Sequence, residues 1–261
     1  MAAPAVLGRA GAVQGSDTIA HTITLPASIA AGERLLVIFS VDQADSLAVY
    51  PDESFSGTRW EKIGQDSNGV SVIGTAFTKV AEGSDALKLI TSTPQQSSHV
   101  SLRIEAANRT LAAVTNGSST NSDPPNLALS EGSPTREVLW IASRSGDAAV
   151  VATVAPSGYA NLQTQTGGAS GASTNTAEKT ATLDSENPGT FTSSIEQWVC
   201  FTIGVWNGNT GKGRVTQEVA EIASVPTSAT RTGRVTQFVV EVVSQGEIPS
   251  TDNVRHLIIA T

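Results

Sequence analysis

The sequence has few residues of the kinds that usually carry cross-links and metal sites. Its 261 residues include one cysteine and three histidines. A single cysteine excludes an intrachain disulfide, so packing or oligomerisation must supply the stability. Cys200 lies in the apolar run 198–206, which favours a small buried core residue.

Basic residues are also scarce. Lysine and arginine together number 16 against 24 acidic residues, which gives a formal net charge of −8. Such a chain is a poor electrostatic match for nucleic acid or an anionic membrane, and the arginines form no cluster. No apolar run approaches the roughly 20 residues of a membrane helix, and the N-terminus lacks the order of a signal peptide. We therefore expect no nucleic-acid partner, no membrane insertion, and synthesis in the cytoplasm.

Catalytic motifs are missing as well. There is no HExxH, no Cys/His cluster and no phosphate loop, so we expect no cofactor, no metal and no catalytic residue. Four carboxylates, Asp42, Asp45, Asp52 and Glu53, stand between two expected strands. They allow a calcium site or a general acid–base pair, but a solvated acidic loop is favoured.

Strand-like runs joined by polar turns make up most of the chain. Arg34–Val41 is almost continuously apolar, as expected of a strand buried on both faces, and His99–Glu105 alternates between apolar and polar residues. Further strands are predicted at 18–25, 86–91 and 196–206. Many short strands with frequent turns predict an all-β fold, a jelly-roll or lectin-like antiparallel β-sandwich.

An internal repeat closes the chain. Residues 213–224 recur twenty residues later at 233–244 with eight of twelve positions identical. We therefore predict a β-sandwich domain over residues 1–207 and a C-terminal β-repeat segment over 208–261. Two strands cannot form a core alone, so we expect the segment to dock, either on its own sandwich or by edge-to-edge addition to another chain. The predicted docking residues are Arg214, Val215, Gln217, Val219, Arg234, Val235, Gln237, Phe238, Val239 and Val240.

Aromatic side chains offer a second kind of contact. Trp140 and Trp198 stand inside apolar runs and are expected in the core. Trp60 adjoins a loop, and with Tyr50 and Tyr159 it forms the most plausible stacking platform for a sugar.

The order of features resembles a β-sandwich domain of tailed-bacteriophage structural proteins, of the minor tail, fibre or head-decoration type. The resemblance rests on segments 22–37, 58–62, 78–84, 138–142, 155–159 and 186–192, and on the repeated Gly-Arg-Val-Thr-Gln of the C-terminal segment. It implies a non-enzymatic virion component that contacts other virion proteins and forms a homo-oligomer, with a trimer as the expected state. The resemblance brings no catalytic residue with it.

Three functions stay open at this point. The first is a virion structural protein docked through its strand repeats, as a minor tail or fibre protein or as a head decoration or cement protein. The second is a carbohydrate-binding adhesin that recognises host surface polysaccharide. The third and least favoured is a polysaccharide hydrolase, which requires two carboxylates facing one cleft.

Overall fold

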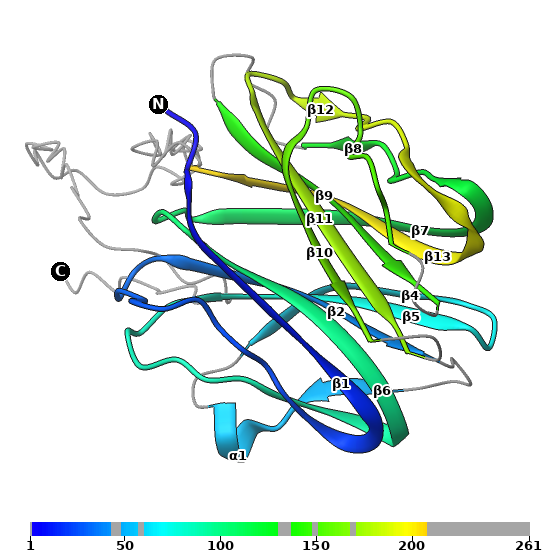
Figure 1. Ribbon diagram of the computed structural model, residues 1–261. Coiled ribbons are helices and arrows are strands. Elements are labelled where there is room, and N and C mark those ends of the chain that lie inside the picture. The colour runs from blue at the N-terminus through cyan, green and yellow to red at the C-terminus, as the bar shows by residue number, and fades with distance from the viewer. Residues whose placement is uncertain are drawn as a thin grey trace, which may run out of the picture. The chain divides into compact units, whose positions relative to one another are not determined.

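The computed structural model describes residues 2–42, 48–56, 60–129, 137–147, 151–167 and 171–207 (Figure 1). Almost all the regular structure in these ranges is β-strand. The strands are β1 (Val6–Thr22), β2 (Arg34–Asp42), β3 (Val49–Pro51), β4 (Glu61–Asn68), β5 (Val72–Val80), β6 (Lys88–Ile104), β7 (Arg109–Ser122), β8 (Leu127–Ala128), β9 (Val138–Gly146), β10 (Ala160–Thr166), β11 (Ser173–Ala181), β12 (Ser185–Glu186) and β13 (Phe191–Trp206), with one short helix, α1 (Glu53–Ser56).

The strands form two main antiparallel sheets that face each other. The first has the order β1-β6-β2-β5-β4, with β3 also paired to β6, and the second has the order β10-β11-β9-β13-β7. Strands β8 and β12 pair separately. The predicted all-β antiparallel sandwich is therefore confirmed.

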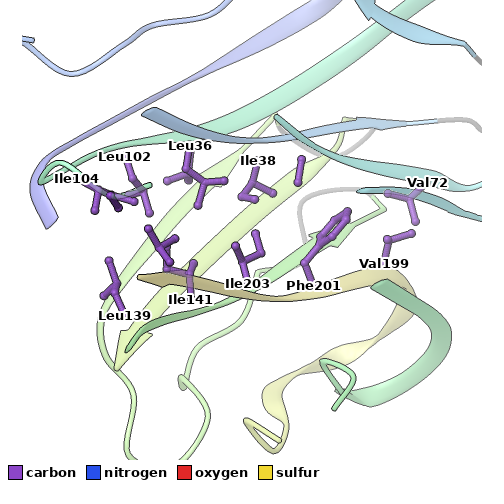
Figure 2. Packing of buried hydrophobic residues seen from close by; sticks show 14 residues of the cluster. Leu36, Ile38, Val72, Leu102, Ile104, Leu139, Ile141, Val199, Phe201 and Ile203 are labelled. Carbon is purple, nitrogen blue, oxygen red and sulfur yellow. The ribbon is translucent and has the colours of Figure 1, made fainter. Parts of the chain in front are cut away.

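A central core fills the space between the sheets. Figure 2 shows Leu36, Ile38 and Leu102 of the first sheet opposite Ile141, Phe201 and Ile203 of the second. All six side chains are buried. Because both faces of β2 are buried, its run of apolar residues is nearly unbroken, as the sequence predicted.

Each sheet also has an outer core beneath its own loops. On the first sheet this core contains Leu35, Val37 and Phe39 of β2 together with Trp60 and Leu89. On the second it gathers Val138, Trp140, Ala142, Tyr159 and Phe191. The described chain therefore buries apolar side chains in three layers: one between the two sheets and one on the outer side of each sheet.

The two halves of the sandwich share one strand order. In chain order the main strands of the first half are β1, β2, β4, β5 and β6, and those of the second are β7, β9, β10, β11 and β13. Numbered one to five along the chain, the strands of each half lie side by side in the order one, five, two, four, three, when the first sheet is followed from β1 and the second from β7. In a jelly roll the chain passes between the sheets repeatedly, whereas within the described residues it passes once. The sandwich thus shares its layers, but not this connectivity, with the jelly-roll type.

The second main strands of the two halves, β2 and β9, meet in the central core. Ser40 pairs across its sheet with Gly74 and Ser98, and Ser145 pairs with Thr174 and Val199. The hydroxyl groups of Ser40 and Ser145 lie 2.6 Å apart and form a hydrogen bond. This hydrogen bond joins the two sheets directly.

An aromatic residue and an ion pair lie at each outer core. Trp60 directly precedes β4, and Tyr159 directly precedes β10. On the neighbouring strands, Lys79 Nζ lies 2.8 Å from Asp85 Oδ1, and Lys179 Nζ lies 3.0 Å from Glu186 Oε1. The described sandwich ends at Asn207, so the predicted boundary at 207/208 and the repeat segment lie outside the described residues and stay predictions.

Candidate interaction surface

The free edge of β1 is the most extended candidate surface. This strand has 17 residues, and within the described chain it pairs only with β6. Leu7, Val13 and Ile19 are 42%, 44% and 50% exposed. Natural edge strands are commonly protected by lysine, proline, charge or bulges. β1 contains neither lysine nor proline, its charged residues are Arg9 and Asp17, and its pairing with β6 is regular from Gly8 to Gln14. The strand therefore presents backbone groups and apolar side chains to a partner.

A groove runs between β1 and the edge of the second sheet. Its volume is about 460 Å³, and Arg9 and Glu178 form an ion pair across it. Asn161, in a left-handed conformation with φ of 55°, also donates to the Glu178 carboxylate. The lining consists of Ala5, Val6, Arg9, Leu139, Gly158, Ala160, Asn161, Glu178, Lys179 and Thr180. The ion pair connects the first part of β1 to β11, while within the described residues no strand pairs with the outer edge of β1.

The opposite side of the sandwich is more closed. There, β7 lies beside β4, and Asn116 Nδ2 donates to Asp66 Oδ2 over 2.9 Å. Asn68 Nδ2 also donates to the carbonyl oxygen of Gly117. Although β7 is the equivalent of β1 in the second half, these contacts hold its side chains and backbone against β4.

The predicted aromatic platform does not form from the three residues named for it. Trp60 is 3% exposed and Tyr159 is 8% exposed, whereas Tyr50 is 49% exposed. Trp60 Nε1 donates to the carbonyl oxygen of Ala86 over 3.1 Å, and burial raises the pKa of Tyr159. Because Trp60 and Tyr159 anchor the outer cores of different sheets, their ring faces are not available for stacking, and the structure contradicts this prediction for both residues.

The predicted docking strands fall outside the part of the chain that the structure describes. This applies to all ten residues proposed for them, from Arg214 to Val240. Their docking role stays a prediction, and so does the choice between pairing within and between chains.

Of the four carboxylates singled out in the sequence, Asp42 and Asp52 each have partners of their own. Asp42 accepts the backbone N–H of Gln96 over 2.8 Å, and burial raises its pKa. Asp52 accepts hydrogen bonds from Ser54, which lower its pKa, and lies 3.7 Å from Lys88 Nζ. Asp45 is outside the described residues, and Glu53 is exposed. Nowhere in the described ranges do three or more His, Cys, Asp or Glu side chains gather as metal ligands would.

Two histidines and the cysteine belong to the interior. His21 Nε2 lies 3.2 Å from Thr91 Oγ1, and His99 Nε2 accepts the backbone N–H of Thr24 over 2.9 Å. Burial lowers the pKa of each imidazole to about 4, so both are neutral at pH 7. Cys200 is completely buried, which raises its pKa and makes the thiol unreactive. The sequence predicted this burial of Cys200.

One buried ionic cluster was not predicted from the sequence. Arg144 is fully buried on β9 and forms an ion pair with Glu196 of β13. Its Nε donates to Ser122 Oγ over 2.9 Å and its Nη1 to Asn175 Oδ1 over 3.0 Å. Burial lowers the pKa of Arg144 to about 10, so the side chain stays charged at pH 7. In the sequence, the one indication of this cluster is that Arg144 directly follows an apolar strand segment. Because the cluster is enclosed, we assign it a structural role.

No described helix is long and apolar enough to cross a membrane. Comparison of the chain with protein-family models, with curated proteins and with solved structures finds no match.

Proposed function

We propose that this chain is a non-enzymatic structural protein of a tailed-phage particle. It is a surface-displayed β-sandwich that joins the particle through its C-terminal strand repeats, as a minor tail or fibre protein or as a head decoration or cement protein. The observation that carries the assembly role is the free edge of β1, where a strand of 17 residues leaves three apolar side chains exposed. Edges of this kind bind other strands by backbone hydrogen bonding.

The segments that resemble phage proteins supply the framework of the sandwich. Trp60, Lys79 and Tyr159 come from these segments, and each lies in or beside an outer core. Val138 and Trp140, from another such segment, are fully buried on β9. The segments that carry the resemblance therefore contain residues of the sandwich's cores and of the contacts beside them.

The proposal is tested by deleting residues 208–261 and measuring incorporation into particles. The three cores lie within residues 2–207, so the shortened chain is expected to keep the sandwich. Tryptophan fluorescence and thermal unfolding verify this before incorporation is measured. Loss of incorporation with an intact sandwich supports the proposal, whereas normal incorporation of the shortened chain refutes docking through the repeats. Antibody–gold labelling of whole particles then distinguishes head from tail.

The groove beside β1 favours a second candidate, the binding of host surface polysaccharide. Planar polar side chains such as those of Arg9, Asn161 and Glu178 can pair with sugar hydroxyl groups. Calorimetry with host polysaccharide tests this, using Asn161→Ala as the groove variant and Tyr50→Ala for the exposed aromatic residue. Saturable heat that Asn161→Ala abolishes supports glycan binding, and the absence of saturable heat refutes it. A hydrolase is not favoured, since Glu178 is the one carboxylate among the described lining residues.

A further inference from the structure

The residues of β1 are arranged symmetrically about Val13. The exposed Leu7 and Ile19 stand six positions before and after it, and the two charged residues, Arg9 and Asp17, stand four positions before and after. If two copies of β1 run antiparallel with Val13 opposite Val13, Leu7 faces Ile19 and Arg9 faces Asp17. Apolar pairs and opposite charges directly across two strands stabilise a sheet. A parallel arrangement in register would instead place Arg9 beside Arg9.

The backbone of β1 is accessible for such pairing. From Gly8 to Gln14 its register against β6 is regular, and β6 occupies one edge of the strand. After Gln14 the register shifts, and Gly15, Ser16 and Asp17 have no partner residue on β6 and are exposed. Asp17 is thus at the surface, four positions from Val13, where Arg9 of an incoming copy would meet it by exchanging its ion pair with Glu178 for one with Asp17.

We propose that β1 pairs with β1 of a second copy of this chain, about a two-fold axis at Val13. The pairing joins the first sheets of two sandwiches into one continuous sheet, with the same patch used on both copies. The self-complementary charges and apolar residues of β1 identify the occupant as a second copy. The equivalent strand β7 is held against β4 and lacks this symmetric pattern. The inference rests on the proposed assembly role and names one contact that this role would use.

Cross-linking tests the position of the axis. Cys200 is the one native cysteine and is completely buried, so Val13→Cys introduces the one accessible thiol. Residues directly opposite on antiparallel strands have Cα atoms about 4.5–5.5 Å apart, within disulfide range. Mild oxidation of full-length Val13→Cys is expected to give a covalent dimer. Ile195→Cys, at a position on β13 that is 72% exposed, is the matched control and should stay monomeric. Equal cross-linking of the two variants would overturn the proposal.

The register is tested by mixing single variants. Leu7→Cys mixed with Ile19→Cys should form a mixed disulfide dimer in larger yield than either variant forms alone. Equal yields of mixed and unmixed dimers would overturn the antiparallel register, because Leu7 would then not lie opposite Ile19.

The charge pairs are tested by sedimentation of the full-length protein. Asp17→Arg places like charges together and is expected to weaken dimerisation at least tenfold, while Glu53→Arg, with the same change in charge at an exposed site of α1, leaves it unchanged. A dimer that is equally weakened by both variants, or no dimer in the wild type, would overturn the proposal. These measurements use purified protein and are independent of incorporation into particles. Failure of Val13→Cys to cross-link therefore refutes the β1 contact alone, whereas normal incorporation of the chain without residues 208–261 refutes docking through the repeats.

Discussion

Acidification is predicted to destabilise the sandwich through two buried histidines. His21 and His99 are each 3% exposed, and burial lowers their pKa from 6.5 to about 4. Between these values the unfolded chain binds more protons than the folded one, so stability is complete above pH 6.5 and is lost as the pH falls towards 4. At pH 5 the loss is about 2 kcal/mol for each histidine. A total of about 4 kcal/mol is a large part of a typical unfolding free energy of roughly 5–15 kcal/mol.

The assay is urea denaturation at pH 7.5, 6 and 5, followed by tryptophan fluorescence. The double variant His21→Asn/His99→Gln removes both titrating groups, and glutamine at 99 can still accept the N–H of Thr24. Carboxylates titrate in the wild type and the variant alike, so the difference between the two slopes isolates the histidines. If stability falls equally in both proteins between pH 7.5 and 5, the histidines are not responsible and the reasoning is refuted.

Three further changes test the packing of the sandwich by denaturant unfolding. Leu36→Ala, in the central core, should lower the free energy of unfolding by about 2–5 kcal/mol. Leu183→Ala, at a position that is 42% exposed, should change it by no more than about 0.5 kcal/mol. Similar losses for the two substitutions would contradict the assignment of the core. Lys79→Met should lower the free energy of unfolding by about 3 kcal/mol, because it leaves the fully buried carboxylate of Asp85 without its cation. A double-mutant cycle with Asp85→Ala should show positive coupling between the two residues. Additive effects of the two substitutions would exclude a functional ion pair. Gly74→Ala should lower the free energy of unfolding by about 1–3 kcal/mol, because the added Cβ would lie 2.8 Å from Ser145 Oγ and 2.9 Å from Val199 Cγ1. Gly15→Ala is the control, since its Cβ would lie 4.0 Å from Gly167 O. Equal effects of the two substitutions would contradict the close approach of the two sheets.

The sequence predicted the strands that carry a clear apolar pattern. The expected strand Arg34–Val41 corresponds to β2, and that at 196–206 falls within β13. Two other expected strands, at 86–91 and 99–105, belong to the single strand β6, because the polar residues between them are also paired. The expected strand at 18–25 captures only the end of β1, since its glycine- and alanine-rich beginning shows no alternation.

The burial of Trp60 and Tyr159 could not be predicted from their local sequence. Both stand next to turns, where an aromatic residue reads as exposed, and they become buried because distant loops fold over each sheet. The shared strand order of the halves was also hidden, because equivalent positions carry different residues. Phe39 of β2 pairs with His99 of β6, whereas Arg144 of β9 pairs with Cys200 of β13, so corresponding strands show no common residue pattern. The exposed edge of β1 depends on which strands pair, and strand pairing is not local information.

The contact of Ser40 with Ser145 has a consequence for how the molecule can vary. The two halves share one strand order and face each other. Because one chain carries both halves, their ratio is fixed, and neither half needs to be complementary to a copy of itself. A substitution in one half is therefore not copied into the other. The inner faces fit each other, while the outer sides of the two sheets differ: His21 packs edge-on against Phe39 in one, and Arg144 pairs with Glu196 in the other.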